Sequence, residues 1–218
     1  MKIKGVISDM DGVILDSEKL YVRFWCEAGR FYGFPMEEKH ALSIRSMARP
    51  LASAKLKGIF GEDFDYEAVR SKRVELMDSY VEKNGIEVKS GAKELLEFLK
   101  ENGYKVALAT ATPPERAERY LKAHDLYKYF DVTVSASMVS FGKPAPDIYL
   151  KAAEMLSLSP QSCVALEDSP NGIKSASSAG CVTVMVPDLD KPSNDIIPLL
   201  HDIANGLSDV KRILRELE

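Results

Sequence analysis

Cysteine and histidine are scarce in this chain of 218 residues, which contains three of each. The cysteines Cys26, Cys163 and Cys181 are widely spaced and form no CxxC pair, so neither a disulfide framework nor a zinc site is expected. The histidines all lie in polar sequence typical of exposed helix surfaces, which leaves a cysteine nucleophile without a partner. Thiol chemistry and zinc chemistry are therefore disfavoured.

Long apolar runs are also absent, since no stretch approaches the roughly 20 apolar residues that span a bilayer. The first residues contain only a short apolar run interrupted by Asp9, which is not the pattern of a signal peptide. The net charge of −4 is spread without long blocks and disfavours a nucleic-acid partner, because phosphate backbones attract a basic surface. We therefore expect a cytoplasmic protein, by default a monomer, that binds neither membrane nor nucleic acid.

Five short apolar runs rich in β-branched residues predict buried strands. They are Ile3–Ser8, Lys105–Ala109, Val132–Ser135, Cys163–Leu166 and Val182–Val186. Helical patterns separate the runs from the second one onward, and this alternation predicts a Rossmann-like, doubly wound parallel α/β sheet. Two further helices are expected in the tail, over Asn194–Ala204 and Asp209–Leu217.

One long interval, between the first two predicted strands, lacks any strand signal. It contains four helical patterns instead: Glu18–Tyr32, Glu37–Arg45, Pro50–Ile59 and Tyr66–Glu82. Such an interval is too long for a loop and predicts an inserted, all-helical cap domain. We therefore expect a catalytic core of residues 1–16 and 86–218 and a cap of residues 17–85.

Polar residues follow four of the predicted strands at or beyond the point where each strand ends. They are Asp9 and Asp11, then Thr110 and Thr112, then Lys143 in the third loop, and finally Glu167 and Asp168. The carboxyl ends of parallel strands share one edge, where open α/β sheets bind ligands. Four clustered acids need a cation, and their hard oxygen ligands suit Mg²⁺ better than Zn²⁺. Together with a lysine and hydroxyl donors, this set is suited to holding a phosphate.

Two common nucleotide-binding patterns are missing, since neither GxxxxGKS/T nor GxGxxG occurs. Four other segments resemble the motifs of the haloacid dehalogenase superfamily, in the family's order. The segments are DMDGVILDSE (Asp9–Glu18), ATAT (Ala109–Thr112), FGKPAPDIY (Phe141–Tyr149) and LEDSPNGIKSASSAG (Leu166–Gly180). The resemblance extends over essentially the whole chain, including the helical insertion after the first motif. The groups it most resembles are sugar-phosphate phosphatases and β-phosphoglucomutase.

The resemblance implies a role for each matching residue. Asp9 would attack phosphorus and form an aspartyl-phosphate, and Asp11 would protonate the leaving group and then deprotonate water. Asp9, the backbone carbonyl of Asp11, Asp168 and Glu167 would hold Mg²⁺, for which Mn²⁺ or Co²⁺ would substitute. The residues expected to contact the phosphoryl group are Thr110, Ala111 and Lys143.

The cap is expected to set specificity. Arg49 falls where the mutase group carries an arginine that grips phosphate, so it is a candidate substrate contact. Tyr21 and Trp25 share a helix face and are expected to pack in the cap. Tyr21 stands where the mutase group has a histidine, and a neutral phenol cannot do proton-linked work near neutral pH. Most of the cap cations are expected to be solvated: Arg45, Arg49, Lys55, Lys57, Lys72 and Arg73.

These observations favour a Mg²⁺-dependent phosphatase with modest discrimination among phosphorylated carbohydrates. A sugar phosphomutase of the β-phosphoglucomutase type is the alternative on the same scaffold. The intact set of acids and lysine argues against a non-catalytic phosphate-binding relic. A dehalogenase would not need the metal site that Glu167 and Asp168 imply. The expected partner is a small phosphorylated metabolite, which the sequence does not name.

Overall fold

The strands predicted from the sequence form one parallel sheet. The computed structural model describes residues 2–217, and within that range six strands pair in the order β3-β2-β1-β4-β5-β6. They are β1 (Gly5–Ser8), β2 (Lys105–Thr110), β3 (Val132–Ser135), β4 (Cys163–Glu167), β5 (Val182–Met185) and β6 (Asp202–Ile203). The five predicted strands are all present, and the Rossmann-like α/β class is confirmed.

The central strand β1 determines where the site lies. It runs between β2 and β4, with Val6 opposite Val106 on one side and Val164 on the other. All three valines are fully buried because helices cover both faces of the sheet, which explains the continuous apolar runs in the sequence. The strand order reverses between β1 and β4, where open α/β sheets form a crevice outside the carboxyl ends of their strands.

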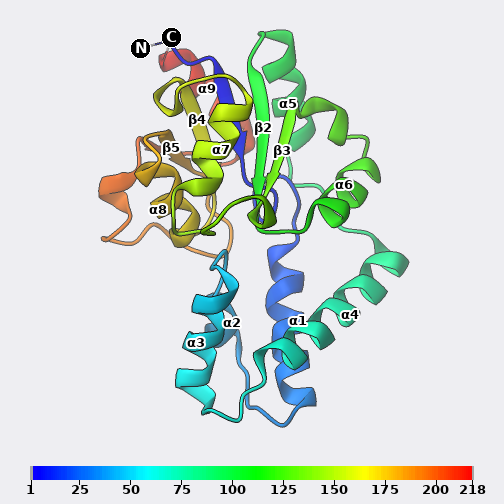
Figure 1. Cartoon of the computed structure of the whole chain (residues 1–218). Helices are drawn as coiled ribbons and strands as arrows, with labels where there is room; N and C mark the ends of the chain where they lie inside the picture. The colour runs from blue at the N-terminus through cyan, green and yellow to red at the C-terminus, as the bar shows by residue number, and fades with distance from the viewer. Residues whose placement is uncertain (1, 218) are drawn as a thin grey trace.

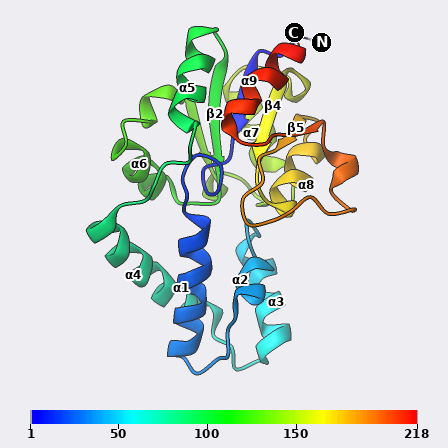
Figure 2. The same cartoon turned by 180° about the vertical axis from the view of Figure 1, so that it is seen from behind.

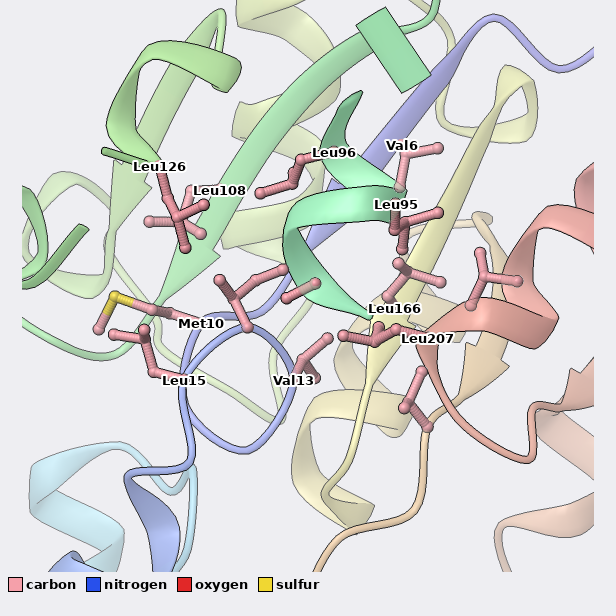
Figure 3. Packing of buried hydrophobic residues seen from close by; sticks show 14 of the residues in the cluster. Val6, Met10, Val13, Leu15, Leu95, Leu96, Leu108, Leu126, Leu166 and Leu207 are labelled. Carbon is pink, nitrogen blue, oxygen red and sulfur yellow. The ribbon is translucent and has the colours of Figure 1, made fainter. Parts of the chain in front are cut away.

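Helices pack on both faces of this sheet (Figure 1 and Figure 2). They are α5 (Ala92–Glu101), α6 (Pro114–Lys122), α7 (Asp147–Met155), α8 (Pro170–Ser178) and α9 (Leu207–Glu216). On one face, Leu95 and Leu96 of α5 pack with Leu207 of α9 against the strands (Figure 3). On the other face, α7 and α8 contribute to a separate cluster. Each buried leucine contributes about 1.5–3 kcal/mol, so these apolar stripes fix the helices on the sheet.

The segment inserted between β1 and β2 extends beyond the carboxyl edge of the sheet (Figure 1). All of it lies in the described part of the chain, and it contains α1 (Glu18–Phe31), α2 (Glu38–Leu42), α3 (Arg49–Phe60) and α4 (Tyr66–Asn84). Its helices share an apolar cluster of their own, in which Leu56 and Phe64 are fully buried. The four helices predicted from the sequence are therefore all present, and they pack as a layer facing the strand ends.

Two adjacent segments connect this helical layer to the sheet. The backbone N–H of Asp16 donates to the carbonyl oxygen of Glu87 at 2.8 Å, and Leu15 forms an antiparallel bridge with Val88. Lys19 pairs with the carboxylates of both Asp16 and Glu87, at 2.6 Å and 2.8 Å. The chain thus leaves and re-enters the core at one point.

The tail departs from the sequence prediction. The prediction of a helix over Asn194–Ala204 is wrong, because this segment forms a 3-10 turn (Ile197–Leu199) followed by strand β6. Pro198 has no N–H for a helical hydrogen bond, and the residues after it pair with β5 through Val184 and Asp202. The other tail helix is present as α9. Three more 3-10 turns lie in the described chain, at Tyr127–Tyr129, Ala136–Met138 and Pro160–Ser162.

Within residues 2–217, no helix combines the length and the apolar character that a membrane-spanning segment requires.

Candidate active site

Lys143 joins three strand ends at the centre of the site. Its Nζ donates to Asp9 Oδ1 at 2.9 Å, to Glu167 Oε1 at 2.5 Å and to the carbonyl oxygen of Ala109 at 3.2 Å. Burial alone lowers the pKa of this lysine, but the carboxylates of Asp9 and Glu167 outweigh burial and raise it above its usual range. Lys143 is therefore a permanent buried cation that neutralises the acids around it.

Asp9 is placed by the turn that follows β1. It is 2% exposed, and its carboxylate faces the cavity between the sheet and the helical layer. Burial raises the pKa of Asp9 to about 8, although Lys143 works in the opposite direction. The nearby carboxylates of Glu167 and Asp11 contribute to this raised pKa, so a cation beside Asp9 would favour its ionised form.

Asp11 lies in a hydroxyl cradle two residues further along. Its Oδ1 accepts from the hydroxyl of Ser17 at 2.5 Å, and its Oδ2 accepts from the hydroxyls of Thr112 at 2.8 Å and Thr110 at 3.4 Å. Burial raises the pKa of Asp11, and these hydrogen bonds oppose that effect. A carboxyl group with a raised pKa can hold a proton closer to neutral pH, as a general acid must.

Three carboxylates at the carboxyl ends of β1 and β4 have the arrangement of a cation site. Asp9, Glu167 and Asp168 each offer an oxygen within 4.8 Å of the others. Oδ1 of Asp168 is buried and has no hydrogen-bond partner in the described chain. Backbone glycines leave space for these groups, since a Cβ on Gly12 would lie 2.1 Å from Asp168 and one on Gly172 would lie 2.0 Å from Glu167. The oxygen donors and the unpaired atom fit a divalent cation.

Glu167 also holds the lysine in place. Its Oε1 accepts from the hydroxyl of Tyr149 at 2.6 Å as well as from Lys143. Glu167 is fully buried, so its contact with Lys143 is shielded from water. Its position therefore supports an additional role in orienting the lysine beside Asp9.

Arg45 connects the helical layer to the acidic centre. It lies between α2 and α3, donates to Asp168, and pairs with Glu18 at 3.1 Å and with Asp190 at 3.0 Å. It is 5% exposed, so it is not one of the solvated cations that the sequence suggested, and Arg73 at 8% is a second exception. No spacing or motif in the sequence distinguishes Arg45 from its neighbours, because its partners come from distant parts of the chain. Glu18, by contrast, is the last residue of the first motif segment, Asp9–Glu18, and could have been included among the candidate site residues.

The remaining predicted residues line the cavity from both sides. Arg49 begins α3, is exposed, and lines this cavity of about 140 Å³ together with Ala111. The hydroxyl of Tyr21 lies 3.3 Å from that of Thr112, which makes it a neighbour of the cradle around Asp11. Trp25 packs against Tyr66 with ring centroids 5.6 Å apart, inside the apolar cluster of the helical layer.

The parallel sheet and its buried acidic centre define an α/β enzyme fold with a cation site, and comparisons with known proteins identify the family. The family model of haloacid dehalogenase-like hydrolases matches residues 3–180. The phosphorylated carbohydrates phosphatase of Thermotoga maritima is 37% identical over 220 residues, which cover 97% of this chain and 90% of that protein. Hexitol phosphatase A of Escherichia coli K12 is 32% identical over 207 residues, which cover 93% of each chain. The chain belongs to the haloacid dehalogenase-like hydrolase family.

A solved structure supports the fold assignment. The β-phosphoglucomutase of Clostridium difficile superimposes with a TM-score of 0.82 at 24% identity, covering 99% of this chain and 96% of the other. At this level of identity the match establishes the shared fold. Hydrolases of the family use a divalent metal, and Asp9, Glu167 and Asp168 form an acidic cluster that could hold one in this chain.

Proposed function

We propose that this protein is a Mg²⁺-dependent phosphatase of phosphorylated carbohydrates that uses Asp9 as its nucleophile. The observation that carries the proposal is the buried centre in which Lys143 holds Asp9 beside Glu167 and Asp168, facing a cavity under the helical layer. The carbohydrate substrate is supported by the names of the Thermotoga maritima and Escherichia coli relatives. Broad specificity within that class is part of the proposal.

In the first half of the reaction, a carboxylate oxygen of Asp9 attacks phosphorus and the bond to the sugar oxygen breaks. Lys143 fixes the Asp9 carboxylate in place by its bond to Oδ1 and offsets part of the negative charge. Asp11, held by Ser17 and Thr112, gives its proton to the departing sugar oxygen. The product of this half is an aspartyl-phosphate and a free hydroxyl on the sugar.

In the second half, the ionised Asp11 takes a proton from water, and the water oxygen attacks phosphorus. The bond to Asp9 then breaks, which releases inorganic phosphate and restores both aspartates. Asp9, Asp168, Glu167 and the backbone carbonyl of Asp11 would hold the cation. When bound, Mg²⁺ supplies the positive charge that lets a carboxylate approach a phosphate dianion. Thr110, whose hydroxyl lies 3.4 Å from Asp11 Oδ2, and Ala111, which lines the cavity, are proposed to contact the oxygens of the phosphoryl group.

We assign residues 17–85 to the cap and residues 1–16 and 86–218 to the catalytic core. This division follows the backbone bond between Asp16 and Glu87, where the chain leaves and re-enters the core. The cap shields the site from bulk water, so the aspartyl-phosphate meets water only where the cavity admits it. A small phosphorylated metabolite is the proposed partner, while the monomeric state and the cytoplasmic location stay predictions.

A sugar phosphomutase is the second candidate, and Arg49 at the cavity is the observation that favours it. Such an enzyme must keep water from the aspartyl-phosphate until a bisphosphorylated sugar has turned over. The phenol of Tyr21 near Thr112 lacks the proton-linked gating of a histidine, so hydrolysis is favoured. With β-glucose 1-phosphate and a trace of the 1,6-bisphosphate, inorganic phosphate should appear faster than glucose 6-phosphate. Rapid formation of glucose 6-phosphate with little free phosphate would establish the mutase instead.

The decisive experiment on the phosphatase is a phosphate-release screen with Mg²⁺ over sugar phosphates, nucleotides and phosphorylated three-carbon acids. Turnover should concentrate among the sugar phosphates, and the variant Asp9→Asn serves as the background control. Turnover of nucleotides alone, or equal rates in the control, would refute the proposal.

A further inference from the structure

Arg45 is a cation of the helical layer whose side chain is buried among acids. It belongs to the docking loop, residues 43–48, which connects α2 to α3. Its guanidinium donates to Asp168 after β4, and it pairs at 3.0 Å with Asp190 after β5 and at 3.1 Å with Glu18 at the start of α1. The docking loop is therefore held by charge to the ends of two strands of the sheet.

Two further hydrogen bonds hold the backbone of the docking loop against the core. The side-chain amide of Asn171 donates to the carbonyl oxygen of Arg45 at 2.8 Å, and the N–H of Ala48 donates to the carbonyl oxygen of Lys143 at 3.0 Å. Between them Ser46 has a φ of 50°, in the left-handed region that residues other than glycine seldom adopt. Such a conformation persists where surrounding contacts impose it, so the loop depends on its contacts with the core.

The carboxylate of Asp168 serves both the docking loop and the acidic centre. It is fully buried, and its Oδ2 accepts from Arg45 while its Oδ1 has no hydrogen-bond partner within residues 2–217. The same carboxylate forms the acidic cluster with Asp9 and Glu167 that could hold a divalent cation. Two cations that share one buried carboxylate repel each other strongly, because little water screens them.

We propose that Arg45 opposes the divalent cation at Asp168, and that a bound cation in turn loosens the docking loop. This inference rests on the cation site of the proposed function and adds a control to it. Arg45 offsets part of the negative charge that attracts the cation, and by linkage the two effects have the same size. Because Arg45, Ser46 and Met47 line the active-site cavity, a loosened docking loop would open that cavity to substrate.

The first test measures the affinity for Mg²⁺ by calorimetry, without substrate, on protein freed of metal with EDTA. Arg45→Gln should bind Mg²⁺ with a Kd at least fivefold smaller than that of the wild type, because it removes the opposing charge. Arg119→Gln is the matched control, since Arg119 of α6 joins the core to Asp78 of α4 at 2.9 Å, outside the acidic cluster. The control should leave the Kd unchanged. An equal or larger Kd in Arg45→Gln would overturn the proposal.

The second test follows the docking loop itself by hydrogen exchange and mass spectrometry. Adding Mg²⁺ to the wild type should speed exchange in a peptide spanning residues 43–48 at least threefold, because the N–H of Ala48 loses its bond to the core. Arg45→Gln should exchange faster before Mg²⁺ is added and respond less to it. Exchange that stays the same or slows when Mg²⁺ is added to the wild type would contradict the coupling.

A second variant covers the case in which Arg45→Gln does not fold. Asn171→Ala removes the bond to the Arg45 carbonyl oxygen without changing any charge, and it should lower the Kd for Mg²⁺ at least twofold. An unchanged Kd in this variant would count against the coupling.

These measurements are independent of turnover. If no sugar phosphate is hydrolysed, the phosphatase assignment fails, and the Kd values still decide the coupling. If sugar phosphates are hydrolysed and Mg²⁺ binds with the same Kd in the wild type and in Arg45→Gln, the coupling fails and the proposed function stands.

Discussion

Two buried cations of this molecule are held in opposite ways. Lys143 in the core donates to two carboxylates and one carbonyl oxygen, and every partner comes from the sheet edge around it. Arg73 in the helical layer lies against the rings of Tyr21 and Trp25, and its Nε and Nη1 have no hydrogen-bond partner within residues 2–217. The difference indicates that the core builds its reaction centre from its own side chains. The helical layer, by contrast, buries the Arg73 cation without pairing it with a carboxylate of residues 2–217.

The largest expected effect comes from removing the proposed nucleophile, Asp9. Asp9→Asn should reduce turnover at least a thousandfold, because an amide neither attacks phosphorus nor offers an anionic ligand to the cation. The change is nearly isosteric, so the melting temperature should stay within a few degrees of the wild type. Phosphate-release assays and calorimetric melting measure the two effects. Activity within tenfold of the wild type would exclude Asp9, as would an acid-quench adduct trapped on Asp11.

The next test removes the buried positive charge of Lys143 from the acidic centre. Lys143→Met leaves Asp9 and Glu167 buried without their shared partner, so turnover should fall at least a hundredfold. Breaking a buried charge pair typically costs about 3–5 kcal/mol, and urea unfolding should detect a loss of that order. Lys151→Met is the matched control because it removes an exposed lysine that pairs with Glu154 on α7. Similar losses in both variants would contradict a special role for Lys143.

Metal removal tests whether the acidic centre needs a bound divalent cation for activity. EDTA should abolish activity, Mg²⁺ should restore it, Mn²⁺ or Co²⁺ should substitute, and Ca²⁺ should restore it poorly because Ca²⁺ favours looser geometry. Asp168→Ala should raise the Mg²⁺ concentration needed for half-maximal activity more than Glu167→Ala does, because Oδ1 of Asp168 has no other partner. Full activity in chelator, or the reverse order of the two variants, would contradict this assignment.

The smallest expected effect concerns the hydroxyl cradle around Asp11, in which Ser17 donates to the Asp11 carboxylate. Ser17→Ala removes a hydrogen bond that stabilises ionised Asp11, so the pKa of Asp11 should rise further. Asp11 must be protonated for the first half of the reaction, and the alkaline limb of kcat/KM should therefore move to higher pH. Profiles of kcat/KM against pH for the variant and the wild type measure this shift. A limb that stays in place or moves to lower pH would assign it to another group.

The sequence predicted which side chains of the acidic centre lie together, because each of them lies close to the end of a predicted strand. Asp9, Thr110 and Glu167 each sit at or directly after an apolar run, and parallel pairing alone brings those ends together. Arg45 and Arg73 could not be identified in this way. Their burial depends on how helices distant in sequence pack, and their residue type is equally common on exposed helix surfaces. The wrong prediction of a helix over Asn194–Ala204 has a similar cause, since pairing with β5 outweighed a local helical pattern.

The junction at Asp16 and Glu87 has a consequence for engineering. The chain enters the inserted helices after Asp16 and leaves them before Glu87, and one backbone hydrogen bond joins these two residues. The inserted helices therefore connect to the sheet through two short, adjacent segments whose ends are already aligned. If the inserted helices were replaced by those of a relative, only these two connecting segments would need to match, and the sheet with its carboxylates would stay unchanged. Chimaeras cut at this point would reveal whether substrate choice travels with the helices or remains with the strands.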